Sequence, residues 1–263
     1  MKEPAALYDG FIAEYYDASP MVTERTGDVR FYCHAARQYG DPVLELGCGT
    51  GRITLAIAEA GYRIVGLDIS GKMLGKAEEK RAALATEARE RVHLVQADMT
   101  NFELGERFRS IIVPFRPFQH LLETAEQIRC LQCAKKHLTP GGRLILDFFQ
   151  TDAARMHDPS FLKESLLVEY GMSGGRRVAQ YERVAAYRRA VQQNDVEMIF
   201  RVQHPGGKQE TLVMGWALRY FFRYEVEHLL ARCGFLVEAL YGNFDRSPLA
   251  DESPEMIFVA AAS

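Results

Sequence analysis

A short glycine-rich segment constrains the fold of this chain more than any other feature of its sequence. Residues 43–46 (Val-Leu-Glu-Leu) are typical of a buried strand, and residues 47–51 (Gly-Cys-Gly-Thr-Gly) follow at once. The glycines permit a tight turn and let the backbone approach a ligand closely, because no side chain is in the way. A helical pattern starts at Arg52, and its first N–H groups can bind an anionic group. The strand, turn and helix together predict a ligand site.

Strand and helix patterns alternate from this segment to residue 149. Short apolar runs are separated by helical segments, which is typical of βαβ units with right-handed crossovers and helices on both faces of a sheet. A helix over residues 224–233 and two more strand patterns lie further along the chain. We therefore expect a doubly wound, Rossmann-like α/β fold with a mostly parallel, seven-stranded sheet. The predicted strands are residues 43–46, 62–67, 92–96, 108–114, 143–149, 235–241 and 255–260.

The sequence changes character between residues 165 and 222, where Val, Tyr, Phe and Arg are frequent. A glycine pair at 174–175 and the sequence His-Pro-Gly-Gly at 204–207 divide this stretch into runs typical of antiparallel strands joined by hairpins. We expect an inserted antiparallel β cap at this place. The predicted organisation is an N-terminal helical lid segment (residues 1–40), a Rossmann-like cofactor-binding domain (41–160 and 223–263) and the β cap, or substrate subdomain (161–222).

Charge and composition argue against several classes of function. The net charge is −3 and 48% of the residues are hydrophobic, so a full core can form but the basic surface typical of nucleic-acid binding is not indicated. No apolar stretch is long enough to span a bilayer, and nothing indicates an anionic membrane as partner. The five cysteines favour free thiols in a reducing cytoplasm. We expect a cytoplasmic protein with a small-molecule partner, no nucleic acid and no membrane, whose cap strands could pair in a homodimer.

Two positions near the glycine-rich segment distinguish between cofactors that bind such a turn. Asp68, 21 residues after Gly47, ends the second predicted strand, where a carboxylate can accept hydrogen bonds from ribose hydroxyls. The dinucleotide fingerprint G-x-G-x-x-G needs a third glycine where this chain has Arg52. Glu45 would repel a pyrophosphate but would suit an ammonium group. These residues favour an amino-acid-tailed nucleoside over a nicotinamide dinucleotide.

Residues 43–52 (VLELGCGTGR) resemble motif I of the class I S-adenosylmethionine-dependent methyltransferases of the small-molecule type. Asp68 and residues 97–99 (Ala-Asp-Met) stand at the later acidic positions of that family. The resemblance covers roughly residues 30–150 and the C-terminal helix and strands. One departure is Arg-Ser at 109–110, where many members begin the fourth strand with an acidic residue. The resemblance implies a transferase that methylates a small-molecule acceptor by in-line displacement, with S-adenosylmethionine as cofactor.

The resemblance also implies which residues bind the cofactor. The end of the first strand and the glycine turn are expected to surround the methionine part. Asp68, which ends the second strand, is expected to hold the ribose. Ile69 and Met73 are expected to pack near the adenine, and Asp98 with Met99 to contact its edge. The predicted cofactor-binding residues are Glu45, Gly47, Cys48, Gly49, Gly51, Asp68, Ile69, Met73, Asp98, Met99 and Phe115.

The loop after the fourth predicted strand, residues 115–120, is expected at the acceptor site, because it follows the carboxyl end of a parallel strand. His120 is the candidate general base, since methylation of a hydroxyl or a protonated amine releases a proton. A loop histidine without a catalytic role is the alternative, and Asp147 and Tyr170 are held in reserve as bases. The residues predicted to line the acceptor pocket are Tyr16, Phe118, Arg219 and Tyr220.

Cys130, Cys133 and His137 have a spacing that superficially resembles a zinc site. They fall on one amphipathic helical pattern and no fourth ligand is evident, so we predict no metal. Two other functions stay open from the sequence: a nicotinamide-dependent oxidoreductase, and a non-catalytic cofactor-binding or regulatory module.

Overall fold

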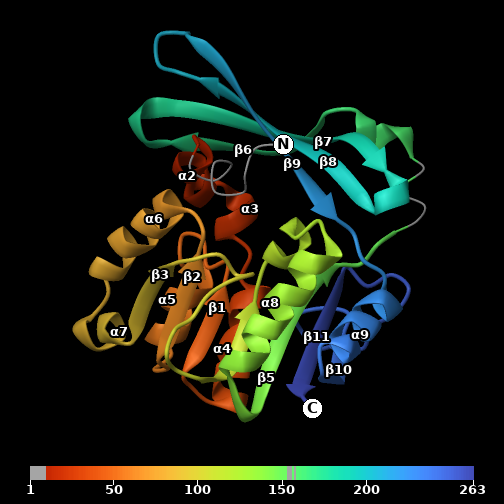
Figure 1. Cartoon of the computed structure of the whole chain (residues 1–263). Helices are drawn as coiled ribbons and strands as arrows, with labels where there is room; N and C mark the ends of the chain where they lie inside the picture. The colour runs from red at the N-terminus through yellow and green to blue at the C-terminus, as the bar shows by residue number, and fades with distance from the viewer. Residues whose placement is uncertain (1–9, 153–155, 157) are drawn as a thin grey trace. The chain divides into compact units, whose positions relative to one another are not determined.

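The computed structural model describes residues 10–152, 156 and 158–263 of the chain (Figure 1). The chain divides into two compact units. The larger unit contains residues 26–150 and 221–263, and the smaller unit contains residues 1–25 and 151–220. In the part of the chain that is described, no helix is long and apolar enough to cross a membrane.

The larger unit is built on a seven-stranded sheet, which confirms the predicted fold class. The strand order is β10-β11-β5-β4-β1-β2-β3. Strands β1 to β5 pair in parallel, whereas β11 runs antiparallel to both β5 and β10. The strands are β1 (Val43–Leu46), β2 (Ile64–Asp68), β3 (Val92–Gln96), β4 (Phe108–Val113), β5 (Leu138–Phe149), β10 (Phe235–Tyr241) and β11 (Glu255–Ala262).

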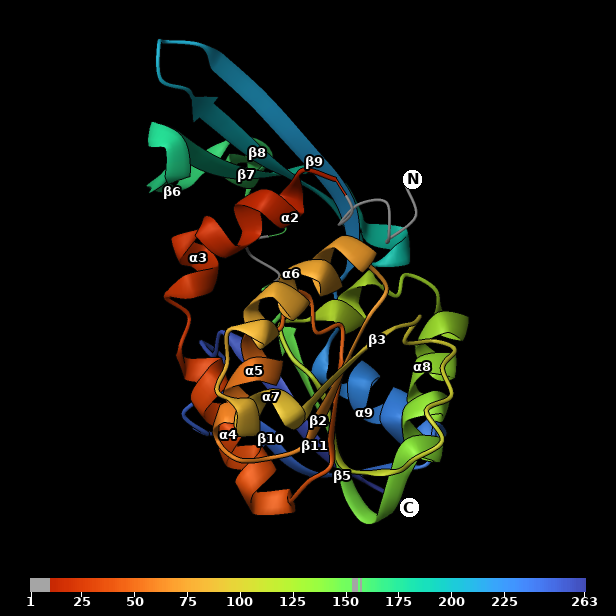
Figure 2. The same ribbon diagram turned by 90° about the vertical axis from the view of Figure 1, so that its left-hand side faces the viewer.

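Helices cover both faces of this sheet, so each face buries its own core (Figure 2). Val43 and Ile145 face α4 and α5, whereas Leu44 and Leu144, the next residues in the same strands, face α8 and α9. Burial on both faces explains why the central strands are continuous apolar runs in the sequence. The helices are α4 (Gly27–Tyr39), α5 (Arg52–Glu59), α6 (Gly71–Ala82), α7 (Thr86–Glu90), α8 (Thr124–His137) and α9 (Arg223–Arg232).

The carboxyl ends of β1, β2 and β4 meet at one edge of the sheet. Leu46 of β1 pairs with Leu67 of β2, and Glu45 pairs with Ile112 of β4. The glycine turn after β1, the acid that ends β2 and the loop after β4 therefore lie close together. The strand order reverses at β1, and this is the position at which open α/β sheets bind ligands.

The smaller unit contains a four-stranded antiparallel sheet whose strands are in chain order. The two predicted hairpins are present, at Ser173–Gly175 and around residues 204–207. A third turn, at Arg189–Gln192, has no glycine and was not visible in the sequence; Gln192 adopts a φ of 53° there. The strands are β6 (Ser165–Met172), β7 (Arg176–Arg188), β8 (Gln193–Gln203) and β9 (Gln209–Arg219).

The N-terminal elements of the smaller unit pack on one face of its sheet. Ile12 and Tyr15 join Phe200 and Met214 in an apolar cluster, and the Ser19 hydroxyl donates to Gln180 Oε1 at 2.7 Å. These elements are α2 (Ile12–Tyr15), η1 (Tyr16–Ala18) and α3 (Pro20–Thr23).

The observed boundaries differ from the predicted domains in two places. Helix α4 was grouped with the lid segment at residues 1–40, but it belongs to the larger unit, because Phe31 and Tyr32 are part of that unit's core. The first nine residues of that segment lie outside the described residues. Residues 151–160 were predicted in the Rossmann-like domain, but the second segment of the smaller unit begins at residue 151.

Candidate cofactor and acceptor site

The glycine turn after β1 is held against the end of β2. Gly47, Gly49 and Gly51 have φ values of 73°, 55° and 81°, a region that glycine adopts without steric cost. The N–H groups of Gly47 and Cys48 donate to the carbonyl oxygen of Leu67 at 2.7 and 2.9 Å. The turn is therefore fixed by backbone contacts before any ligand binds.

Two of these glycines have different surroundings. A Cβ atom at Gly47 would lie 2.6 Å from Cβ of Pro117, in the loop after β4, so a side chain cannot be accommodated without moving that loop. At Gly49 the nearest atom to such a Cβ is Cε of Met73 at 3.9 Å. Without a side chain, Gly47 lets Pro117 of the β4 loop pack against the turn. Gly49 instead leaves room for a ligand above the turn.

Asp68 joins the glycine turn to the start of α6. Its Oδ2 accepts from the Gly49 N–H at 2.7 Å, and its Oδ1 accepts from the Ser70 N–H at 2.8 Å. Ser70 is the N-cap of α6, since its hydroxyl accepts from the Met73 N–H at 3.1 Å. Asp68 is 9% exposed, and each carboxylate oxygen can accept a second hydrogen bond. The carboxylate is oriented by the backbone and can also hold ribose hydroxyls.

Glu45 lies inside the sheet beside α5 rather than on the surface of the turn. It is 2% exposed and accepts a hydrogen bond from the Thr54 hydroxyl. Burial raises the pKa of Glu45 to about 8, although Thr54 and Arg52 act in the opposite direction. A neutral carboxyl at this place becomes charged when a cation approaches, so Glu45 fits a ligand that carries an ammonium group. The sequence did not indicate Thr54 as its partner.

The residues predicted to contact the adenine are divided between buried and exposed positions. Met73 is buried and Met99 is half-buried, and both terminal methyl groups lie near the glycine turn. Ile69 is half-buried, and its carbonyl accepts from Gln96 Nε2 at 3.1 Å. Asp98 is exposed, and its Oδ1 accepts from the Thr100 N–H at 2.7 Å. Asp98 therefore stabilises its own turn, which leaves its second oxygen for a ligand.

The loop after β4 has an unusual backbone. Phe115 and Arg116 have φ values of 64° and 66°, and each such residue costs about 1–3 kcal/mol unless its surroundings impose the conformation. Arg116 forms an ion pair with Glu255, and both side chains are 6% exposed. The Arg116 guanidinium also lies 3.4 Å from the ring centroid of Phe149. These contacts provide the stabilisation that the local sequence lacks.

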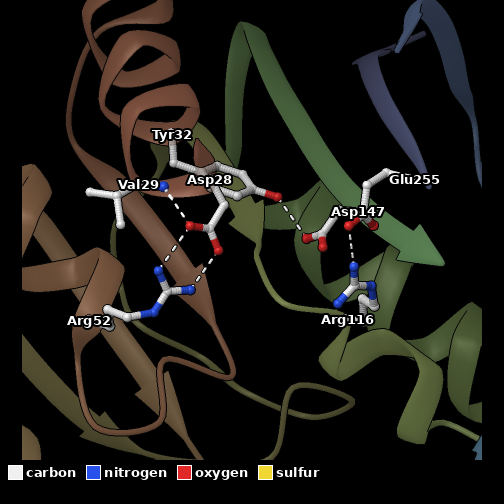
Figure 3. A network of polar contacts seen from close by, with 7 residues as sticks. All are labelled: Asp28, Val29, Tyr32, Arg52, Arg116, Asp147 and Glu255. Atoms are coloured by element: carbon white, nitrogen blue, oxygen red, sulfur yellow. Dashed lines mark hydrogen bonds and ion pairs between the residues drawn. The ribbon is translucent and has the colours of Figure 1, made fainter. Parts of the chain in front are cut away.

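Three polar contacts, two of them buried and one partly buried, lie near this edge of the sheet, and none was predicted (Figure 3). Besides the Arg116–Glu255 pair, Arg52 donates two hydrogen bonds to the Asp28 carboxylate, at 2.9 and 2.6 Å. The Tyr32 hydroxyl donates to Asp147 Oδ1 at 2.8 Å. Burial raises the pKa of Tyr32 well above its usual value, so this phenol keeps its proton. Asp147, a reserve base in the sequence-based hypothesis, is thus fully buried and occupied by a hydrogen bond.

Two other residues of the β4 loop have clear environments. His120 ends a short helical turn, Pro117–His120, and its burial lowers its pKa to about 4. The imidazole is therefore neutral at physiological pH and able to accept a proton. Phe118 is 1% exposed and packs against Phe148 and Phe221. Phe118 was predicted in the acceptor pocket, but the structure places its ring in the core, and we do not retain it as a pocket residue.

The remaining predicted acceptor residues belong to the smaller unit. Arg219 Nη1 donates to the Val191 carbonyl at 3.3 Å, and the Tyr220 N–H donates to the Gln192 carbonyl at 3.0 Å. These contacts connect the end of β9 to the turn between β7 and β8. Tyr16 packs at the edge of the apolar cluster, and burial raises the pKa of Tyr170, a reserve base, to about 12. Contact of these residues with an acceptor stays a prediction.

His137 has a structural role that explains its spacing from the cysteines. Its Nδ1 lies 2.8 Å from the Cys133 carbonyl oxygen, and its Nε2 accepts from the Leu104 N–H at 3.2 Å. Both ring nitrogens are therefore used inside the protein. Among the described residues, no group of three His, Cys, Asp or Glu side chains is arranged to hold a metal ion. All five cysteines are free thiols in the structure.

Comparisons with known proteins agree with this geometry. Residues 43–142 match the family described as "Methyltransferase domain". The cypemycin N-terminal methyltransferase of a Streptomyces species is 34% identical over 148 residues, which are 56% of this chain and 58% of that protein. The dTDP-3-amino-3,4,6-trideoxy-α-D-glucopyranose N,N-dimethyltransferase of Streptomyces venezuelae is 25% identical over 232 residues, 88% and 86% of the two chains.

A solved structure extends the fold comparison to nearly the whole chain. The CcbJ methyltransferase from Streptomyces caelestis superimposes with a TM-score of 0.77 at 23% identity and covers 98% of both chains. The chain spans about half the length of the first curated relatives that it matches. The chain thus resembles methyltransferases in residues 43–142 and shares the fold of a solved methyltransferase over nearly its whole length.

Proposed function

We propose that this chain is an S-adenosylmethionine-dependent methyltransferase that methylates a small-molecule acceptor. The observation that carries the proposal is the glycine turn with Asp68 closed against it at the reversal point of the sheet. Glu45 is buried next to this turn with a raised pKa, and an ammonium group that binds there would favour its charged form and pair with it. The relatives named above methylate an N-terminus and an amino sugar, and these names support a nitrogen acceptor for this chain.

The residues present fit the cofactor and have separate tasks. The open space at Gly49 and the first N–H groups of α5 would receive the amino-acid part, and Asp68 would hold the ribose. Bound S-adenosylmethionine supplies a methyl group on a positively charged sulfur, which a nucleophile can displace directly. The task of the protein is then to hold the acceptor in line, and such orientation contributes about 7–11 kcal/mol to lowering a barrier.

His120 is the proposed base of this reaction. Its lowered pKa, about 4, keeps the imidazole unprotonated at neutral pH but makes it a weak base, so its role as a base requires that acceptor binding raises this pKa towards neutrality. The loop that contains His120 follows β4, at the same edge of the sheet as the glycine turn. Asp147 is a weaker candidate because Tyr32 already donates to it.

The smaller unit is proposed to select the acceptor, and its sheet offers a surface for a homodimer. Strand β9 is an edge strand of eleven residues, and the unpaired backbone groups of such an edge can bind another strand. Light scattering on the purified protein measures the mass; a monomer at all concentrations would contradict the dimer. The cytoplasmic location is proposed from the five free cysteines.

Calorimetry and mass spectrometry test the proposed function. We expect wild-type protein to bind S-adenosylmethionine, and Asp68→Ala to lose about 1–3 kcal/mol of binding free energy through loss of a charge-assisted hydrogen bond. Asp245→Ala is the matched control, because Asp245 is outside the glycine turn and accepts from the Ser247 N–H. Unchanged affinity in Asp68→Ala, or binding of NADH in its place, would contradict the proposal.

Methyl transfer itself is tested with a panel of amines: a dTDP-3-amino sugar, a peptide with a free N-terminus, and glycine. A mass increase of one methyl group on one of them supports the enzyme. Tight cofactor binding without transfer to any acceptor in a wider metabolite library would favour a non-catalytic module instead.

A further inference from the structure

The ion pair between Arg116 and Glu255 connects the loop after β4 to a strand far along the chain. The two residues are 139 positions apart, and both side chains are almost completely buried. Glu255 is the first residue of β11 and pairs with Phe149, the last residue of β5. Figure 3 shows the two side chains facing each other at the end of these strands. The pair therefore joins the β4 loop to the two neighbouring strands on one side of it.

Two further contacts attach the same loop to β5. The Arg116 guanidinium lies over the Phe149 ring, at 3.4 Å from its centroid. The Gln119 side-chain carbonyl accepts a hydrogen bond from the Phe149 N–H at 3.2 Å. A planar cation that is both ion-paired and stacked has little freedom to turn, so Arg116 fixes the direction of the loop as well as its position.

The other side of the loop presses on the glycine turn. Pro117 occupies the space in which a Gly47 side chain would stand. Residues other than glycine rarely adopt a positive φ, yet Arg116 has a φ of 66° and a ψ of 28°. This backbone is not the preference of the local sequence, so the contacts of Arg116 must impose it.

We propose that the Arg116–Glu255 ion pair is a positioning device for methyl transfer. It holds residues 115–120 in the conformation that closes Pro117 over Gly47 and fixes His120 beside the carboxyl end of β4. Arg116 and Glu255 act through the loop and do not themselves contact the acceptor. This inference rests on the proposed function for its catalytic consequence, but its effect on the loop is independent of that function.

A double substitution, Arg116→Met with Glu255→Met, tests the proposal without leaving a buried charge. Replacing a buried ion pair by apolar side chains of similar size often preserves stability, so this variant is expected to fold. Ile257→Val is the matched control, because Ile257 is a wholly buried residue of the same strand that lies outside the ion pair. If the double variant does not fold, Arg116→Gln with Glu255→Gln gives the same comparison, since it removes both charges and keeps polar groups that can pair with each other.

The first measurements need no acceptor. Hydrogen exchange of the amides in residues 115–120 is expected to accelerate about tenfold or more in the double variant and to be unchanged in Ile257→Val. An NMR titration is expected to show the pKa of His120 rising from about 4 towards the ordinary value of a histidine, as the loop opens to water. Unchanged exchange together with an unchanged titration would overturn the proposal.

The catalytic consequence is measured on the acceptor identified from the amine panel. The double variant is expected to lose about 10–100-fold in kcat, because small misplacements of reacting groups have effects of this size. Its Kd for S-adenosylmethionine is expected to rise by less than its kcat falls, since the contacts of Asp68 do not involve the loop, although Phe115 and Pro117 belong to it. An unchanged kcat would overturn the positioning role. If wild-type protein fails to bind S-adenosylmethionine, the proposed function fails, and the exchange measurement still decides whether the ion pair holds the loop.

Discussion

The glycine turn after β1 and the loop after β4 lie at the same edge of the sheet, but they are held in different ways. The turn is fixed by near neighbours in the chain: Gly49 binds Asp68, which is 19 positions away, and the intervening residues form one βαβ unit. The loop is fixed by Glu255, 139 positions away. The comparison teaches that one half of a site can be built by local chain geometry while the other half depends on a distant strand.

Removing the distant partner should have the largest effect on stability. Glu255→Ala leaves Arg116 buried without its counter-charge, and we expect the free energy of unfolding to fall by about 3–5 kcal/mol. Urea denaturation measures this change. The control is Glu238→Ala, which breaks a more exposed pair with Arg143 and should cost at most about 1 kcal/mol. Equal losses in the two variants would show that the buried pair does not hold the loop.

The glycine turn can be examined through Glu45, the residue two positions before Gly47, by measuring the free energy of unfolding as a function of pH. Glu45 has a pKa of about 8 in the folded protein and an ordinary value of about 4.3 in the unfolded chain. The folded state therefore binds the proton more tightly, so stability from neutral Glu45 is fully present below about pH 4 and is lost as pH rises towards 8. Between pH 5 and 8 we expect a loss on the order of 3 kcal/mol that is missing in Glu45→Gln. Superimposable stability profiles of wild type and variant would contradict this.

The contact between the glycine turn after β1 and the loop after β4 is tested by a pair of glycine substitutions. Gly47→Ala places a methyl group against Pro117 on a left-handed backbone, and we expect a loss of about 2–4 kcal/mol in the free energy of unfolding. Gly49→Ala has the same backbone requirement, but its Cβ would meet only Cε of Met73 at 3.9 Å, an ordinary contact distance, so it should cost only about 1–2 kcal/mol. Thermal and urea denaturation measure both variants. If Gly49→Ala is as destabilising as Gly47→Ala, the approach of Pro117 does not explain the first glycine.

The same contrast explains how much of the molecule could be predicted from its sequence. The seven-stranded sheet and the position of Asp68 at the end of β2 follow from local patterns, because strands, strand ends and glycine turns have residue signatures. The Tyr32–Asp147 bond joins residues 115 positions apart, and no local pattern marks either as a partner. Phe118 was misassigned for a related reason, since an aromatic residue in a loop gives no sign of whether it faces a ligand or the core.

The order of the strands has a consequence for how the protein is made on the ribosome. Residue 116 leaves the exit tunnel long before residue 255, which reaches the sheet only as β11 inserts between β5 and β10. A nascent chain that stops between these two positions already contains the segment proposed to recognise the nucleoside but lacks the counter-charge of Arg116. Cofactor recognition and the ability to use the cofactor can therefore arise at different moments of synthesis.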